Sequence, residues 1–328
     1  MLSNMRIFVI GASAGGRKAI EMVLAQIPAN INAVFMIVVH GFSETPSVFV
    51  KFLYKRTNLT VLEAKNNTPL ESGNVYIAKP DYHLFVYNEK IYISKGQREN
   101  LFRPSIDVLF RSAAVAYGNL CVGLLLTGRL NDGTAGLEAI KKCGGIAIIQ
   151  NPATAEFAEM PSYASNYVEI DYVVNIEDIG GVLQKICDEN IPGRIELPPS
   201  VVRENFMAIK MGEKDFRNNA LQRQGPFSCS TCGGPLWKVG DSEIGRYRCH
   251  LGHAFTEEAL LKSQDFVLEE ALWIAVRTLE EKKMLLERVH CEYNKNDIGV
   301  LANFHKNKID EVQWQISKLR NILEISDR

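Results

Sequence analysis

The chain has 328 residues, 46% of them hydrophobic, and a formal net charge of −1 at pH 7. This length allows two domains, or one large domain with an appendage, and the near-neutral charge excludes a nucleic-acid-binding surface over the whole chain. No apolar run approaches the roughly 18 residues that a membrane span needs, and the N-terminus has no signal-peptide pattern, so we expect a cytoplasmic protein.

Residues 7–16 have the pattern of a strand that turns sharply into a helix. The apolar run 7–10 ends in the small residues GASAGG, and a helix is expected over residues 18–26. The pattern places Ser13 at the carboxyl edge of a sheet, and the glycines behind it leave backbone N–H groups free at the helix N-terminus. A serine beside such donors suits acyl transfer, because the tetrahedral oxyanion needs them.

Two other interpretations of this turn stay open. Glycine-rich turns between strand and helix often bind a nucleotide phosphate, but the dinucleotide fingerprint needs glycine where this chain has Ser13. The fingerprint also needs an acidic residue after the next strand, whereas the apolar run 33–39 ends in His40. A purely structural turn is the second alternative.

Strand-like and helix-like segments alternate from residue 6 to about residue 190. A hairpin is expected around Asn88 and Glu89, which separate two strand-like segments. The alternation predicts an α/β fold with a doubly wound, mostly parallel sheet. The expected strands are residues 33–39, 60–63, 75–78, 83–87, 90–94, 120–126, 146–149 and 172–174, and the expected helices are residues 47–55, 107–116, 137–142 and 179–186.

Three of these strands end in polar residues whose chemistry fits together. The first ends at Ser13, the second at His40, and strand 120–126 leads to Asp132 in a polar loop. The carboxyl ends of parallel strands meet at one edge of a sheet, where active sites lie. A serine hydroxyl needs a base, and an imidazole base needs a carboxylate that fixes its tautomer. Taken singly, His40 is a polar strand end and Asp132 a helix N-cap.

The sequence resembles the chemotaxis protein-glutamate methylesterase family (CheB) over roughly residues 5–190. Each matching segment alone is weakly specific, but their order and spacing together are highly specific. The segments are GASAGG (11–16), VH (39–40), GNVYIA (73–78) with HL (83–84), RPSIDVLF (103–110), LTG (126–128) with NDG (131–133), and QNP (150–152) with MP (160–161).

The resemblance implies that Ser13 is the nucleophile, His40 the base and Asp132 the orienting acid, with no cofactor for catalysis. It also implies γ-glutamyl methyl esters on the cytoplasmic helices of chemoreceptors as substrates. Some members of the family deamidate receptor glutamines as well. The residues that the resemblance assigns to the oxyanion and substrate loop are Ala14, Gly15, Arg129 and Asn131.

The sequence departs from the family pattern in three places. The loop before the aspartate usually reads Thr-Gly-Met-Gly, and Arg129 and Leu130 replace its last two residues. The residue after the nucleophile is often threonine and is Ala14 here, whose backbone N–H remains available. The family commonly begins with a phosphorylatable receiver domain, but only five residues precede the first strand, so we expect no control by phosphorylation in cis.

A cysteine cluster follows a proline-rich boundary at residues 190–200. Cys229 and Cys232 form a C-x-x-C motif, and Cys249 is followed by His253 at C-x3-H spacing. These four ligands suit a closed, structural zinc ribbon, with His250 as the alternative fourth ligand. A redox C-x-x-C is the other interpretation, but it lacks a βαβ context. The scattered cysteines, which we expect to be reduced, are Cys121, Cys143, Cys187 and Cys291.

The chain reads as helical from residue 257 onward. Apolar residues recur at heptad spacing over residues 268–289 and 309–323, with a break at residues 294–299. This pattern predicts two long helices that form a hairpin. Whether the hairpin packs only on itself, or forms a homodimer or a coiled coil with a partner, stays open.

These patterns predict a serine carboxylic-ester hydrolase of the methylesterase type that acts on a methylated chemoreceptor or a related signalling protein. A non-catalytic signalling adaptor that keeps the fold is the alternative. We expect residues 1–190 to fold and to hydrolyse small esters without the tail, because the proline-rich boundary is long enough to let the tail move. The predicted segments are a catalytic domain (1–190), a linker (191–227), a zinc ribbon (228–256) and a helical hairpin or coiled coil (257–328).

Overall fold

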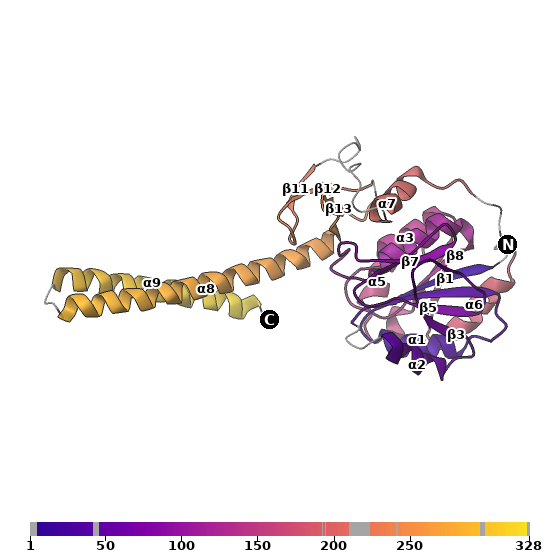
Figure 1. Cartoon of the computed structure of the whole chain (residues 1–328), viewed down its shortest axis with the longest axis horizontal. Helices are drawn as coiled ribbons and strands as arrows, with labels where there is room; N and C mark the ends of the chain where they lie inside the picture. Colours follow the sequence, from indigo (N-terminus) through magenta and orange to yellow (C-terminus); the bar gives the residue numbers. More distant parts are fainter. Residues whose placement is uncertain are drawn as a thin grey trace. The chain divides into compact units, whose positions relative to one another are not determined.

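A seven-stranded parallel sheet, here called the main sheet, organises the first part of the chain (Figure 1). The computed structural model describes residues 5–41, 46–191, 193, 195–209, 224–240, 242–295 and 299–326. The strand order is β10-β9-β8-β1-β2-β5-β3, and every pair of neighbours is parallel. The strands are β1 (Arg6–Ala12), β2 (Ala33–Val39), β3 (Thr60–Glu63), β5 (Asn74–Ile77), β8 (Cys121–Leu125), β9 (Ile146–Gln150) and β10 (Tyr172–Val174). The predicted α/β fold with a mostly parallel sheet is confirmed.

Helices cover both faces of the main sheet, which explains its nearly continuous apolar strands. Along β1, Ile7 and Val9 belong to one apolar core, and Phe8 and Ile10 belong to the core on the opposite face. This alternation follows from the two-residue repeat of a strand. The first face is covered by α3 (Ile106–Tyr117), α4 (Thr134–Lys142) and α5 (Glu159–Tyr167), and the second by α1 (Gly16–Ala25), α2 (Pro46–Tyr54) and α6 (Ile179–Asp188). In Figure 1, α3 lies on one side of the main sheet and α1 and α2 lie on the other.

The predicted hairpin is also present, formed by β6 (His83–Tyr87) and β7 (Lys90–Ser94). The two-residue strand β4 (Thr68–Pro69) pairs with β7. Short 3-10 helices occupy Gly118–Leu120 and Pro152–Thr154. The structure adds one helix that the sequence pattern did not indicate, α7 (Pro199–Ile209), within the predicted linker. Residues 210–223 of that linker lie outside the described residues.

Four antiparallel strands form a second sheet, here called the small sheet. Their apolar core includes Leu236, Tyr247, Phe255 and Leu260. The strands are β11 (Gln224–Ser228), β12 (Pro235–Lys238), β13 (Arg246–Cys249) and β14 (Ala254–Thr256).

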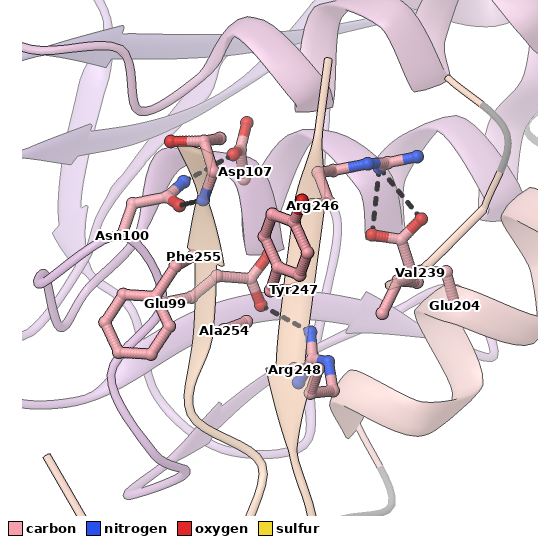
Figure 2. A pocket seen from close by; sticks show the side chains of 11 residues that line it. Glu99, Asn100, Asp107, Glu204, Val239, Arg246, Tyr247, Arg248, Ala254 and Phe255 are labelled. Carbon is pink, nitrogen blue, oxygen red and sulfur yellow. Dashed lines mark hydrogen bonds and ion pairs between the residues drawn. The ribbon is translucent and has the colours of Figure 1, made fainter. Parts of the chain in front are cut away.

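Charged side chains join the small sheet to the rest of its unit (Figure 2). Arg248 on β13 donates to Glu99 at 2.9 Å, and Arg246 donates to Glu204 on α7 at 2.9 Å. Figure 2 also shows Asn100 and Asp107 beside β14, around a cavity of about 10 Å³. A cavity of that size holds at most about one water molecule, so the two surfaces are closely packed.

The chain divides into two compact units, Met1–Leu260 and Leu261–Arg328. The second unit holds most of α8 (Glu257–Lys295) and α9 (Gly299–Ser326), which confirms the predicted pair of long helices. Their shared core contains Val276, Val312, Ile316 and Leu323 as buried residues, whereas Leu268, at the start of the predicted heptad stripe, is 60% exposed. No helix in the described part of the chain is long and apolar enough to cross a membrane. The division into four segments at residues 190, 227 and 256 stays a prediction.

Candidate active site

Ser13 lies where β1 ends, in a turn that begins α1. Its N–H donates to the carbonyl of Thr127 at 3.0 Å, and its own carbonyl accepts from the N–H of Gly16 at 2.9 Å. Gly15 has a φ of +73°, and a Cβ there would lie 2.9 Å from Oε2 of Glu156, so the turn requires glycine. Among the hydrogen bonds of the described residues, none uses the N–H of Ala14 or of Gly15. Two backbone donors are therefore available beside the hydroxyl of Ser13.

His40 follows β2 at the same edge of the main sheet. The register pairs Ala12 with Val39, and the N–H of His40 donates to the carbonyl of Ala12 at 3.0 Å. Ser13 follows Ala12 and His40 follows Val39, so the two residues are neighbours on adjacent strands, which lie about 4.8 Å apart. The imidazole stacks on the ring of Phe102, with centroids 3.7 Å apart and planes 9° apart.

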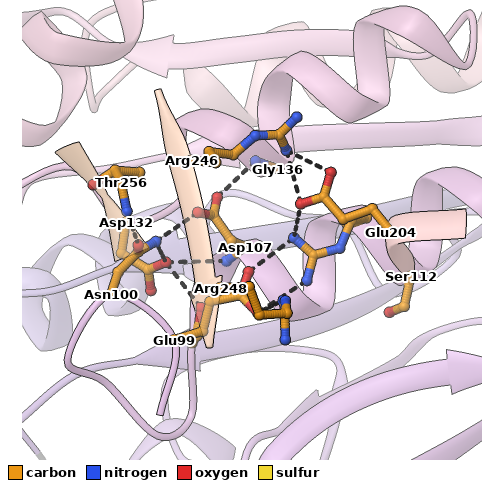
Figure 3. A network of polar contacts seen from close by, with 12 residues as sticks. Glu99, Asn100, Asp107, Ser112, Asp132, Gly136, Glu204, Arg246, Arg248 and Thr256 are labelled. Atoms are coloured by element: carbon orange, nitrogen blue, oxygen red, sulfur yellow. Dashed lines mark hydrogen bonds and ion pairs between the residues drawn. The ribbon is translucent and has the colours of Figure 1, made fainter. Parts of the chain in front are cut away.

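Asp132 is fully buried and meets His40 from the loop after β8. Its Oδ2 lies 3.0 Å from Nε2 of His40. The carboxylate also accepts hydrogen bonds from Ser105 Oγ (2.9 Å) and the N–H of Ile106 (2.6 Å). Asn100 Nδ2 donates to it at 3.0 Å (Figure 3). Because Ser105 and Ile106 begin α3, the helix directs its N-terminal N–H groups and positive dipole end at the carboxylate.

These contacts set the charge of two neighbouring carboxyl groups. Burial alone would raise the pKa of Asp132, but the contact with His40 and the hydrogen bonds from Asn100 and Ile106 together lower it. Burial, followed by the charge of Asp132, raises the pKa of Asp107 well above its ordinary value. Asp107 accepts from the N–H groups of Gly133 and Gly136 at 3.0 and 2.6 Å, so it fixes the loop that carries Asp132.

A second buried histidine supports the start of α3. Nδ1 of His83 accepts from the N–H of Ser105 at 3.2 Å, and its Nε2 lies 2.8 Å from the carbonyl of Gln97. One ring nitrogen must therefore accept and the other donate, which is the pattern of a neutral imidazole. Burial lowers the pKa of His83 accordingly.

The remaining predicted loop residues lie in different surroundings. Arg129 is exposed, and its guanidinium lies over the ring of Phe157 at 4.9 Å. Asn131 is buried, and its amide contacts Thr256. Gly128 lies against the candidate nucleophile, because a Cβ there would come within 2.8 Å of the Cβ of Ser13. A cleft of about 280 Å³ opens at His40 and is lined by Val39, Gly41, Pro80, Asp81, Arg98, Phe102, Arg103 and Pro104.

The structure brings the predicted metal ligands together in the small sheet. The ligand atoms of Cys229, Cys232, Cys249 and His253 all lie within 4.8 Å of one another. The sulfur atoms of Cys232 and Cys249 are 3.7 Å apart, and Sγ of Cys249 is 3.4 Å from Nδ1 of His253. Tetrahedral zinc with Zn–S bonds of about 2.3 Å requires sulfur atoms about 3.8 Å apart, so the cluster fits such an ion. The ring of His250 lies outside this group, next to Gly234.

Sequence reasoning missed the groups that hold Asp132. Asn100 and Ser105 donate to its carboxylate, and Asp107 fixes its loop. The resemblance does include Ser105 and Asp107, so the motif RPSID was a signal that polar residues at the start of a helix serve the site. No pattern in the sequence indicated Thr256, which contacts the same loop from the small sheet.

Comparisons with known proteins point to one family. The family described as CheB methylesterase matches residues 8–183. A Leptospira interrogans protein is 38% identical over 192 residues, which are 58% of this chain and all of that protein. The protein-glutamate methylesterase/protein-glutamine glutaminase 2 of Methanosarcina mazei is 35% identical over 195 residues, 56% of this chain. The corresponding enzyme of Salmonella typhimurium is 37% identical over 186 residues, 55% of this chain.

This chain spans 52% of the length of each of the last two relatives. The crystal structure of the Thermotoga maritima CheB methylesterase catalytic domain superposes with a TM-score of 0.53 at 30% identity. The superposition covers 56% of this chain and 98% of that domain. The family match falls on the part of the chain that carries Ser13, His40 and Asp132. This chain belongs to the CheB methylesterase family.

Proposed function

We propose that this protein is a protein-glutamate methylesterase, a serine hydrolase that cleaves γ-glutamyl methyl esters on a chemoreceptor-type protein. The contact of 3.0 Å between His40 and Asp132, one strand away from Ser13, carries the proposal. The names of the Methanosarcina and Salmonella relatives support the substrate class. A cytoplasmic location follows from that substrate and is part of the proposal.

In the proposed reaction, Oγ of Ser13 attacks the ester carbonyl and its proton passes to the ring nitrogen of His40 that does not face Asp132. The buried carboxylate of Asp132 stabilises the imidazolium that forms. The N–H groups of Ala14 and Gly15 stabilise the oxyanion. Methanol leaves with the proton from the imidazolium, and water then hydrolyses the acyl-enzyme to glutamate. With a glutamine substrate the same steps release ammonia.

Replacing Ser13 with alanine tests the covalent mechanism. The variant should fold normally, because alanine is small enough for the turn, and it should release no methanol from methylated receptor. Ser165→Ala is the matched control, since Ser165 is exposed on α5 and its hydroxyl donates to the carbonyl of Ser162. Single and double alanine variants of His40 and Asp132 should lose similar activity, because residues that act as a unit are not additive. Near-normal turnover by folded Ser13→Ala would exclude this mechanism.

The alternative is a non-catalytic signalling adaptor that keeps the methylesterase fold. It predicts no methanol release by the unaltered protein, and no difference between that protein and Ser13→Ala in any assay. The two backbone donors beside Ser13 and the helix N-terminus at Asp132 favour the enzyme, because an adaptor needs neither.

We also propose that the cluster of Cys229, Cys232, Cys249 and His253 binds one structural zinc ion per chain. The spacing of the ligand atoms supports it. All four ligands come from the protein, so the ion would have no open position for catalysis. Elemental analysis of protein purified without chelator should give one zinc per chain, and Cys232→Ser should lower that value. Absence of zinc from the unaltered protein would disprove the assignment.

The second unit is proposed to supply a contact surface for a second copy or for a partner protein. Large apolar side chains remain exposed on it, including Trp273 at 52% and Trp314 at 62%. Light scattering of the full chain distinguishes the two possibilities, because a homodimer doubles the mass of the purified protein. The catalytic domain, linker, ribbon and hairpin boundaries given above are part of this proposal.

A further inference from the structure

The small sheet contacts the same loop that carries the candidate catalytic aspartate. Oγ1 of Thr256, the last residue of β14, lies 2.8 Å from Nδ2 and 3.0 Å from Oδ1 of Asn131. Asn131 directly precedes Asp132 in the chain. The hydroxyl of Thr256 therefore fixes the side chain adjacent to the carboxylate that contacts His40.

The backbone of β14 reaches Asp132 by a second route. The N–H of Thr256 donates to Oδ1 of Asn100 at 2.9 Å. Nδ2 of the same asparagine donates to Oδ1 of Asp132 at 3.0 Å, and to Asp107 at 2.7 Å. The N–H of Asn100 also donates to the carbonyl of Ala254 at 2.9 Å. One strand thus orients the asparagine that in turn donates to the carboxylate.

Buried charges hold this strand in place. Arg248 on β13 and Arg111 on α3 both donate to Glu99, the residue before Asn100. The two arginine side chains are 2% and 1% exposed. Moving the small sheet away would separate the buried guanidinium of Arg248 from Glu99 and leave Arg111 as the charged partner of that carboxylate. Breaking a buried ion pair in this way is costly. The small sheet is therefore fixed to the residues around Asp132, which argues against the expectation that residues 1–190 act unaided.

We propose that Thr256 is a positioning residue of the esterase, which holds Asp132 against His40 through Asn131 and Asn100. This inference rests on the proposed function, because it assigns a purpose to the contact between His40 and Asp132. It makes the C-terminal small sheet a structural part of the active site.

The test compares Thr256→Val, which removes the hydroxyl at nearly constant volume, with Thr256→Ser, which keeps it. Two quantities are measured on the full chain: methanol release from methylated receptor, and the rate at which a fluorophosphonate probe labels Ser13. The probe reports the reactivity of the serine without any receptor, so a wrong substrate assignment and a wrong positioning role give different results. Thr256 Oγ1 also accepts from the N–H of Ala259 at the start of α8. Thermal unfolding is therefore recorded, and both assays are run well below the transition.

We expect Thr256→Val to lower kcat and the labelling rate about tenfold to a hundredfold with little change in KM, since small misplacement of catalytic groups has effects of this size. Thr256→Ser should restore both. Ser242→Ala is the matched control. It removes a hydroxyl of the same region that donates to Glu138 at 2.7 Å, and Glu138 is not among the groups that bond to Asp132, so both rates should stay unchanged.

A double-mutant cycle with Asn131→Ala gives an independent readout. If the two side chains act through each other, Thr256→Val should cost little more once Asn131 is replaced. Normal labelling and turnover in folded Thr256→Val would overturn the proposal. So would equal losses in Thr256→Val and Thr256→Ser, because the hydroxyl would then not be the group that matters. If the probe labels Ser13 of the unaltered protein but that protein does not hydrolyse methylated receptor, the proposed substrate is wrong and the positioning role is not affected.

Discussion

Replacing Glu99 with glutamine tests how strongly buried charges join the small sheet to the main sheet. The carboxylate accepts hydrogen bonds from Arg111 at 2.8 and 3.1 Å and from Arg248 at 2.9 Å. The side chain of Glu99 is 8% exposed. Burial alone would raise its pKa, but the two guanidinium groups outweigh that effect and hold the pKa far below its ordinary value. The residue is therefore a buried anion that serves two buried cations.

The expected loss of stability depends on which hydrogen-bond partners each arginine retains in the Glu99→Gln variant. Without the charge on Glu99, Arg111 retains Glu204 at 3.2 Å. Among the described residues, Arg248 then retains only the carbonyl of Gly252 at 3.1 Å. Removing one partner of a buried ion pair costs about 3–5 kcal/mol, and we expect Glu99→Gln to fall in that range. For a unit of this size, each kcal/mol lowers Tm by about 2–4 °C, so Tm should fall by roughly 6–20 °C.

Thermal unfolding of the full chain, followed by circular dichroism or calorimetry, measures this loss. Glu21→Gln is the matched control, because Glu21 forms a partly exposed pair with Arg56 and such pairs contribute about 0–1 kcal/mol. A Tm for Glu99→Gln within about 2 °C of the control would refute the reasoning, since this buried pair would then be worth no more than a surface pair.

Three further outcomes are expected. Gly128→Ala should lower kcat by tenfold or more, because the new Cβ would lie 2.8 Å from the Cβ of Ser13. Gly181→Ala is the control, because nothing lies within 4 Å of the added Cβ, and it should leave kcat unchanged. Steady-state kinetics on both variants test this. Folding lowers the pKa of His83 below its ordinary 6.5, so at low pH the unfolded chain binds more protons than the folded chain. The free energy of unfolding should therefore be highest above about pH 6.5 and decrease below it. Denaturant unfolding across pH should show a shallower decrease in His83→Gln. Chelation of the proposed zinc should disorder the small sheet and lower kcat, while the main sheet stays folded. Circular dichroism and methanol assays together would detect both effects. Full activity in metal-free protein would contradict this prediction.

The sequence was sufficient to predict the edge of the sheet where the candidate site lies. Ser13 and His40 each follow an apolar strand, and parallel strands end at the same edge, so periodicity alone places both residues there. Asp132 follows a third such strand. The structure adds the register that makes Ser13 and His40 neighbours and the distance of 3.0 Å that joins His40 to Asp132. The roles of the three residues stay predictions.

The contacts around Asp132 were beyond sequence reasoning for a physical reason. Asn100 and Thr256 are 156 positions apart. Asn100 lies in the loop between β7 and α3, and Thr256 ends a short strand, so no periodic pattern indicates a partner for either. Helix α7 was missed because it is short and follows directly on the proline-rich boundary. It is held by packing on α3 and by the ion pair of Glu204 with Arg111. Local propensity is a weak guide where tertiary contacts decide the structure.

The contacts between the small sheet and the residues around Glu99 fit a positioning role better than a stabilising one. Buried ion pairs contribute little stability compared with apolar residues of similar size, because desolvation offsets their attraction, but their geometry is directional. Glu99 can accept from Arg111 and Arg248 together only when β13 lies at one position beside the loop, and β14 is paired to β13 in a fixed register. A shift of one residue would turn the hydroxyl of Thr256 to the other face of the strand, away from Asn131. Directional contacts that permit a single register are what a strand needs if it is to hold an aspartate to within a fraction of an ångström of its histidine.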